Sequence, residues 1–255
     1  MDGCVVGVDV ATRWRDTGSA RLTFAQGRVV DVQTPAIRWP DGTLTATGLA
    51  DAIDAHARAH DVLAVALDGP QGWRDPATPI GTPGVGRRCE RACATQGKVG
   101  PFGRMYPGTS LAWGKLCIAT FDELLCKPGV ELANGEGIRA SSGGYLVMEC
   151  SPTSAWRSSG LRPLPSKAKR PATRPYAEVL AGAYGLPDLG APGHDDLQAI
   201  VAALVAMAVV GGPGRAIACG TPASSVSTPD AGLLRVEGLI WNVEPPLVVG
   251  ASKPP

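Results

Sequence analysis

The sequence predicts an α/β fold with a mixed sheet, in which an antiparallel hairpin meander is followed by parallel strands and helices cover both faces. Three observations predict this arrangement. Two valine-rich runs, at residues 4–10 and 62–68, are typical of buried strands. Alternating hydrophobic residues on both sides of Gln26-Gly27 indicate a hairpin after the first strand. A helical spacing of apolar residues over 46–60 then favours a crossover to a strand parallel to the first.

The chain is expected to form a single domain over residues 1–255. Hydrophobic residues make up 44% of it and charged residues 18%, an ordinary globular composition that can supply a large core. A net charge of +1 gives no global attraction to nucleic acid or membranes, so any basic patch must be local. No basic segment with an apolar core opens the chain, and the apolar run 199–210 is too short to span a bilayer. We therefore expect a cytoplasmic protein without a membrane partner.

The first part of the chain supplies the meander and the crossover. After the first strand, strands at 20–25 and 28–32 form the hairpin. A helix over 46–60 follows, with Thr47 as its expected N-cap, because a threonine hydroxyl can accept a hydrogen bond from the first turn. The strand at 62–68 then runs parallel to its partner.

The rest of the chain alternates between regular elements and long loops. Segments rich in glycine and proline are expected to be loop-rich insertions near 69–86, 99–143 and 151–175. The same two periodicities predict helices over 87–98, 110–126, 176–184 and 194–210, and strands over 144–150, 216–219 and 233–241. An extended or mobile path through 151–177 is favoured by Pro163, Pro165, Pro171 and Pro175.

Carboxylates stand at the ends of predicted strands and at the start of the late helix. They are Asp9, Asp68, Glu149 and Asp195. Strand carboxyl ends line the ligand crevice of α/β sheets, so Asp9 and Asp68 would lie side by side on neighbouring strands. Converging carboxylates repel one another, and a divalent cation relieves this repulsion. An all-oxygen ligand set suits Mg²⁺ or Mn²⁺, and two such ions could clamp the oxygens of a phosphodiester.

Basic residues gather in two stretches of a chain that is otherwise almost neutral. They are Arg87, Arg88 and Arg91 in the predicted basic helix, and Lys167, Lys169 and Arg174 in the acid-free segment 151–177. Basic loop residues are most often simply solvated. Beside a metal site, however, they could hold the phosphates of a nucleic acid, which makes them candidate substrate-binding residues.

The order of these features resembles the ribonuclease H-like superfamily: a GVDxA first strand, a hairpin, a helix, a second acidic strand end, and a late helix that opens with Asp195-Asp196. More narrowly, the chain is similar to the DUF429 family of predicted nucleases over most of its length. The motifs that carry this similarity are Leu67-Asp68-Gly69-Pro70, Gly86-Arg87-Arg88-Cys89-Glu90-Arg91, Glu149-Cys150-Ser151-Pro152, Ser166-Lys167 before Arg174, and Glu237-Gly238-Leu239-Ile240-Trp241.

The resemblance implies that the four acids named above bind metal, with Asp9 bridging the ions. One position departs from the D-x-x-D pair that related resolvase-like sites often carry on the late helix, because Gln198 follows Asp195 there. An amide supplies no charge, so either Asp196 substitutes as a ligand or a second metal is held more weakly. His194 is expected to orient a water or contact the scissile phosphate, or else to be a simple cap-side residue.

A metal-dependent nuclease that hydrolyses phosphodiester bonds of nucleic acid, with Mg²⁺ or Mn²⁺ as its cofactor, is therefore the leading hypothesis. A catalytically silent binding module of the same fold is an alternative, because Gln198 leaves room for a lost second metal. A phosphotransferase of the actin or sugar-kinase type is the third, although Asp16-Thr17-Gly18 is a poor phosphate-binding loop.

Overall fold

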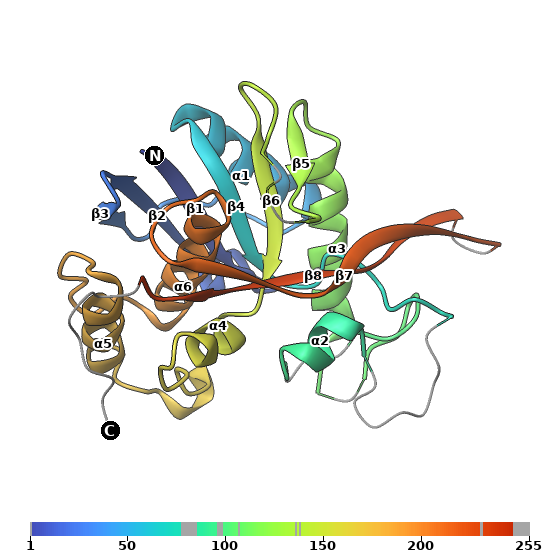
Figure 1. Cartoon of the computed structure of the whole chain (residues 1–255). Helices are drawn as coiled ribbons and strands as arrows, with labels where there is room; N and C mark the ends of the chain where they lie inside the picture. The colour runs from blue at the N-terminus through green and yellow to red at the C-terminus, as the bar shows by residue number, and fades with distance from the viewer. Residues whose placement is uncertain are drawn as a thin grey trace.

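A computed structural model of the chain describes residues 2–77, 86–95, 99–106, 108–135, 137, 139–229 and 232–246. Its strands are β1 (Gly3–Asp9), β2 (Gly18–Ala25), β3 (Arg28–Gln33), β4 (Val62–Asp68), β5 (Val130–Leu132), β6 (Tyr145–Cys150), β7 (Arg215–Thr228) and β8 (Gly232–Glu244). Within the described ranges they form one sheet in the order β3-β2-β1-β4-β6-β8-β7, and β5 pairs with β6 beside this path (Figure 1). The predicted mixed α/β sheet is confirmed.

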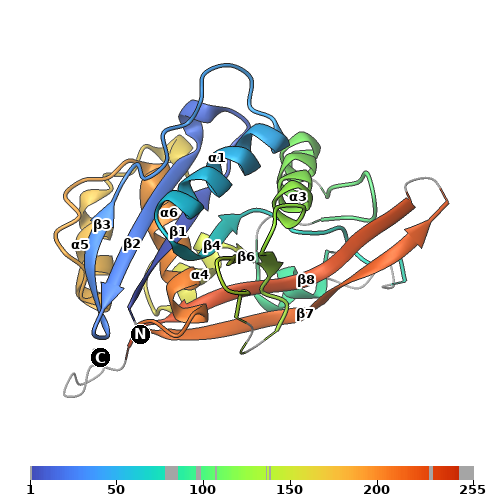
Figure 2. The ribbon, with the colours of Figure 1, turned by 90° about the horizontal axis from the view of Figure 1, so that it is seen from above.

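The helices are α1 (Ala46–Ala59), α2 (Arg88–Ala92), α3 (Leu111–Leu125), α4 (Pro152–Ser158), α5 (Arg174–Tyr184) and α6 (His194–Val209), with single 3₁₀ turns η1 (Trp14–Asp16) and η2 (Lys167–Lys169). Helices α1 and α3 share one buried core with the sheet, and α4, α5 and α6 share another (Figure 2). Adjacent residues of β1 face opposite cores, since Val5 packs with the α6 group and Val6 with the α1 group. Both faces of the sheet are therefore covered, as predicted.

The register of the first strands places two of the predicted acids side by side. Strand β1 runs antiparallel to β2 and parallel to β4. In this pairing Asp9, the last residue of β1, lies opposite Asp68 on β4 and opposite Gly18 on β2. The expectation that the first and fourth strands are neighbours is confirmed.

Two glycines allow α6 to lie directly on this part of the sheet. A Cβ added to Gly7 would lie 2.0 Å from the carbonyl oxygen of Ala199, and one added to Gly18 would lie 2.3 Å from the carbonyl carbon of Asp195. Real side chains cannot occupy such positions, so β1 and β2 need glycine where the helix crosses them. This close approach brings the first turn of α6 to the end of β1.

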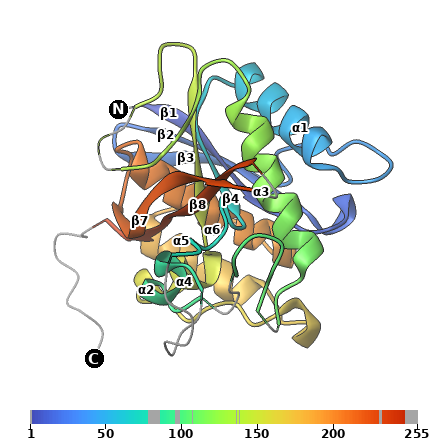
Figure 3. The ribbon, with the colours of Figure 1, turned by 90° about the vertical axis from the view of Figure 1, so that its right-hand side faces the viewer.

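The last two strands differ most from the sequence prediction. They form a hairpin much longer than residues 216–219 and 233–241, and β8 runs parallel to β6 at the carboxyl end of that strand. The hairpin extends beyond the rest of the sheet (Figure 1), and α2 and α4 pack against it and lie below it in Figure 3. The outer half of β7 is rich in serine and threonine without clear alternation, which is why the sequence predicted only the inner part of that strand, whereas 233–241 covers most of β8.

Three smaller predictions were wrong. Helix α2 is shorter than 87–98, of which residues 96–98 lie outside the described ranges. Segment 151–177 is not extended throughout, because Pro152 occupies the first turn of α4, where proline is favoured. The N-cap of α1 is Thr45, whose hydroxyl accepts a hydrogen bond from the Gly48 N–H, whereas Thr47 contacts Glu123 instead.

The loop-rich segment 99–143 contains one more regular element than expected, the short strand β5, besides the predicted helix α3.

Among the described residues, none of the helices combines the length and the hydropathy that crossing a bilayer requires.

Candidate metal centre

Asp9 and Asp68 form a carboxyl pair at the ends of β1 and β4. Both side chains are half-buried, and they share a hydrogen bond. Burial raises the pKa of Asp9 well above its usual range, and the nearby charges of Asp68 and Asp195 raise it further. Burial also raises the pKa of Asp68, to about 7. A hydrogen bond between two carboxyl groups requires a proton on one of them, so the pair shares a proton when no cation is present.

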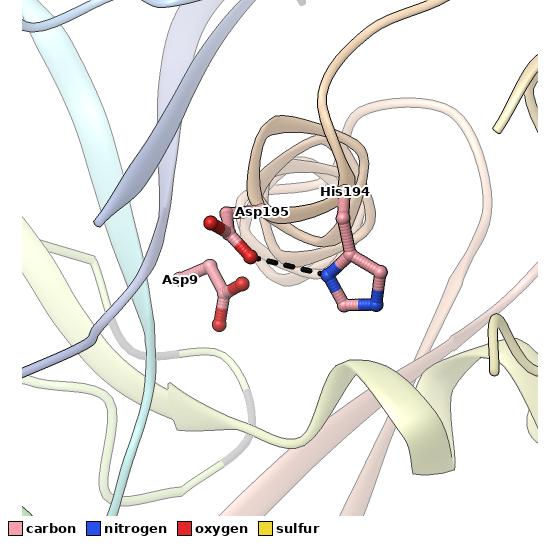
Figure 4. Close-up of side chains that lie close together, drawn as sticks. All are labelled: Asp9, His194 and Asp195. Carbon is pink, nitrogen blue, oxygen red and sulfur yellow. Dashed lines mark hydrogen bonds and ion pairs between the residues drawn. The ribbon is translucent and has the colours of Figure 1, made fainter. Parts of the chain in front are cut away.

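Helix α6 adds two further ligand candidates from its first turn. Asp9, His194 and Asp195 each place one possible ligand atom within 4.8 Å of the others. Among the described residues, this is the cluster of acidic and histidine side chains close enough together to hold a metal ion. Figure 4 shows the three side chains pointing toward one another, with His194 Nδ1 and Asp195 Oδ1 3.1 Å apart. Residues from opposite parts of the sequence thus converge on one point.

The hydrogen bonds of His194 leave one ring nitrogen suited to a metal. Its Nε2 lies 3.0 Å from the carbonyl oxygen of Pro165, which can only accept a hydrogen bond. With Nε2 as the donor to this carbonyl, Nδ1 is the nitrogen that could offer a lone pair to a cation, in place of the proton that it donates to Asp195 Oδ1 when no cation is bound. Metal-binding histidines are held in this way, with the second ring nitrogen donating to a backbone carbonyl.

Lys167 is the counter-ion of this acid cluster. Its ammonium pairs with Asp195 and lies 3.1 Å from Asp16 Oδ1, while half of its side chain stays exposed. Partial burial opposes ionisation of Asp195, but hydrogen bonds from His194 and Lys167 hold its pKa below the usual range. Of the basic residues predicted to bind substrate, Lys167 is therefore placed directly at the centre.

Glu149 is bound to protein groups rather than to the centre. It is buried, and it accepts hydrogen bonds from Arg87 Nη1 at 2.7 Å, Arg87 Nη2 at 2.5 Å and the Gln71 N–H at 2.8 Å. Arg87 also pairs with Glu90 at 3.1 Å. Arg87 was predicted to bind substrate, but its guanidinium is 1% exposed and already paired with two carboxylates.

Asp196 and Gln198 on α6 form hydrogen bonds with residues other than the three candidate ligands. Asp196 accepts a hydrogen bond from the Ser19 N–H at 3.3 Å, which turns its carboxylate toward β2. Gln198 is buried, and its Oε1 accepts a hydrogen bond from Trp156 Nε1 at 2.9 Å. Gln198 therefore has a packing role between α6 and α4, which explains an amide at this position.

The remaining predicted basic residues are not gathered around the acids. Arg88 is exposed, and its backbone N–H donates to Glu237. Arg91 is half-buried on the same short helix, and Lys169 is exposed on η2. Arg174 pairs with Glu178 on α5 at 2.9 Å.

Two hollows flank the centre. On the Asp195 side, a groove of about 590 Å³ has a lining that includes Trp14, Arg15, Arg38, Trp39 and residues 193–196. On the Asp68 side, a pocket of about 190 Å³ is lined in part by the hydroxyl-bearing residues Thr95, Thr109, Ser151 and Thr153. Sequence reasoning missed this groove. Its one visible signal was tryptophan beside arginine in two short polar loops, at 13–15 and 38–39.

Two carboxylates and an imidazole can hold a divalent cation, although the nitrogen ligand departs from the all-oxygen set expected from sequence. Comparison with protein-family profiles, with curated proteins and with solved structures finds no match for this chain.

Proposed function

We propose that this chain is a metal-dependent nuclease of ribonuclease H-like fold, akin to the DUF429 family, that hydrolyses phosphodiester bonds in nucleic acid. The observation that carries the proposal is the convergence of Asp9, His194 and Asp195 at the carboxyl end of the sheet. The strand order supports the fold assignment, because an antiparallel β3-β2-β1 meander continues into parallel β4 and β6. The half-exposed Lys167 beside the acids supports an anionic substrate.

Asp9, Asp195 and His194 Nδ1 would hold the Mg²⁺ or Mn²⁺ ion. When bound in such a site, the ion lowers the pKa of a water ligand and neutralises charge on the phosphate. A single ion agrees better with the contacts than two ions do. Glu149 is already bonded to Arg87, and Gln198 to Trp156, so neither side chain is available for a second ion.

The chain's own residues have separable roles around this ligand set. Asp68 holds the Asp9 carboxyl through their shared hydrogen bond. Pro165 fixes the ring of His194 by accepting from Nε2. Lys167 neutralises Asp195 in the absence of substrate. Its exposed ammonium can pair with a phosphate oxygen instead when a substrate binds.

A catalytically silent binding module is the second candidate, and the Arg87–Glu149 ion pair favours it, because that pair removes one predicted metal ligand. The phosphotransferase hypothesis has less support. Thr17 Oγ1 donates to the Arg13 carbonyl and accepts from the Ala11 N–H, while Asp16 pairs with Arg13 and Lys167. These groups are occupied by one another rather than arranged to bind a nucleotide phosphate.

The test is Mn²⁺- and Mg²⁺-dependent cleavage of labelled single-stranded, duplex and branched DNA and RNA by the purified chain. Asp9→Asn should abolish cleavage while the melting curve and circular dichroism stay those of a folded protein. Asp31→Asn, an exposed acid on β3, is the matched control and should cleave normally. Cleavage that survives Asp9→Asn would refute the nuclease proposal, and metal binding without cleavage of any substrate would support the silent module.

A further inference from the structure

We infer that the groove beside the metal centre binds single-stranded nucleic acid, by stacking an unpaired base on Trp14 and Trp39 and pairing phosphates with Arg15 and Arg38. This inference deepens the proposed function and names the form of its substrate. The groove lies between two loops, residues 10–17 and 34–45, and the start of α6. Its volume of about 590 Å³ is in the range of small-ligand sites.

The two tryptophan rings form a stacked platform in the lining of the groove. Their centroids lie 5.6 Å apart with an interplanar angle of 23°, and both side chains are half-buried. Trp39 is held by a hydrogen bond from its Nε1 to the Thr17 carbonyl oxygen at 2.8 Å. Stacking on such rings is how proteins hold unpaired bases, because every base has a π-face.

Trp14 lacks the hydrogen bond that a structural tryptophan usually makes. Its Nε1 is buried, and within the described residues it has no acceptor. Buried indole N–H groups normally find a partner, and leaving one unpaired opposes folding. Both tryptophans pack against the core on the α1 face of the sheet, and this packing leaves the Trp14 indole N–H without an acceptor among the described residues.

The charges along the groove match a nucleic acid strand that leads to the metal centre. The lining of the groove joins the candidate ligands His194 and Asp195 to the exposed Arg15 and Arg38. The side chain of Arg15 is 75% exposed. Its nearest approach to Asp16 is 3.8 Å, which is long for an ion pair, so the guanidinium can reach an incoming phosphate. Guanidinium groups beside aromatic rings suit a backbone whose bases are turned inward.

The occupant is single-stranded rather than duplex because stacking needs an open base face. In a duplex both faces of each base are covered by neighbouring pairs, so a tryptophan platform would gain nothing from it except at an end. The groove also borders Asp195, which would place a phosphate of the stacked nucleotide close to the proposed ion.

Binding is tested with a thymidine dodecamer, an abasic dodecamer with the same phosphates, and a hairpin duplex, in EDTA so that no cleavage occurs. Tryptophan fluorescence and anisotropy report the affinity. We expect the thymidine strand to quench fluorescence and to bind at least about tenfold more tightly than the abasic strand. Trp39→Ala should remove that difference, and Arg38→Ala should weaken both strands and reduce the salt dependence.

Phe102→Ala is the matched control, because Phe102 is an exposed aromatic ring that meets Trp73 edge to face outside the groove lining. It should bind the thymidine strand like the unaltered chain. If Trp39→Ala fails to fold, the exposed Arg15→Ala and Arg38→Ala variants decide the question. Equal affinity for the thymidine and abasic strands, or unchanged binding in folded Trp39→Ala, would overturn the inference.

The outcomes for the groove and for the nuclease are distinguishable. Strand binding that needs Trp39, without Mn²⁺-dependent cleavage, would retain the groove and refute the nuclease. Cleavage that needs Asp9 but is indifferent to Trp39 and to base removal would retain the nuclease and refute the groove.

Discussion

Asp9 and Asp68 lie directly opposite each other on two parallel strands, and their carboxyl groups are joined by a hydrogen bond. Within the part of the chain that the structure describes, neither acid forms an ion pair with a basic side chain, in contrast to Asp195 and Glu149. The strand ends therefore hold two acids whose mutual repulsion is not neutralised by direct ion pairs. This arrangement has measurable consequences for stability and for cation binding.

The first consequence is a pH-dependent stability of the metal-free chain. Because the folded-state pKa of Asp68 is raised to about 7, its stabilising contribution is full below the unfolded-state pKa near 4 and is lost as pH rises through 7. Asp68→Asn should therefore raise the free energy of unfolding at pH 8 by about 1–3 kcal/mol and leave it little changed at pH 4. Urea unfolding at several pH values measures this, with Asp31→Asn as the unaffected control.

The second consequence concerns two adjacent acids with different partners. Asp195 faces Asp9 and His194, whereas Asp196 accepts from the Ser19 N–H. Asp195→Asn should weaken Mn²⁺ binding by roughly tenfold or more, and Asp196→Asn should leave it nearly unchanged. Electron paramagnetic resonance of free Mn²⁺ gives both affinities. Equal losses in the two variants would show that Asp196 is a ligand as well.

A third prediction separates a structural arginine from an exposed one. Arg87 pairs with Glu149 and Glu90 in a buried site, so Arg87→Met removes the ion-pair partner of Glu149 and one partner of Glu90. We expect a loss of about 3–5 kcal/mol in the free energy of unfolding. Arg88→Met, at the exposed neighbouring position, should change stability by less than about 0.5 kcal/mol. Thermal or urea unfolding compares the pair, and similar losses would contradict the buried ion pair.

The fourth prediction tests the close approach of α6. Gly18→Ala places a methyl group against the Asp195 backbone and should displace the start of the helix, lowering both stability and Mn²⁺ affinity. Gly182→Ala in α5 meets no atom within 4 Å and should instead stabilise the fold by about 0.5–1 kcal/mol. Calorimetry and Mn²⁺ titration of both variants distinguish a steric effect from a general effect of added methyl groups.

Much of the sheet was predictable because its strands carry strong local signals. The runs at 4–10 and 62–68 are apolar and β-branched, so their burial followed from pattern alone, whereas their pairing was only the condition under which Asp9 and Asp68 would meet. The β7–β8 hairpin was predicted only in part, since the outer residues of β7 are polar and their pairing is set by the partner strand. Helix α4 was missed because Pro163, Pro165, Pro171 and Pro175 indicated an extended path for the whole segment. These four prolines all follow the helix, whereas Pro152 begins it.

The site was predicted least well where charges pair over long distances in the sequence. No local pattern shows that Arg87 belongs to Glu149, or that Gln198 accepts from Trp156. Burial decides these cases, because an arginine counted as a phosphate ligand becomes a structural counter-ion once it is enclosed. The groove was missed for a related reason: its two tryptophans lie in separate loops that only the fold brings together.

Gly7 and Gly18, on which α6 packs, also determine when during folding the proposed cation site is completed. Asp9 and Asp68 meet once β1 and β4 pair, but His194 and Asp195 arrive only when a helix translated far later docks on Gly7 and Gly18. A nascent chain therefore presents an incomplete chelate until its longest-range contacts have formed. A cation that binds afterwards would stabilise the docked position of α6. Bound metal would therefore distinguish chains that have completed folding from those that have not.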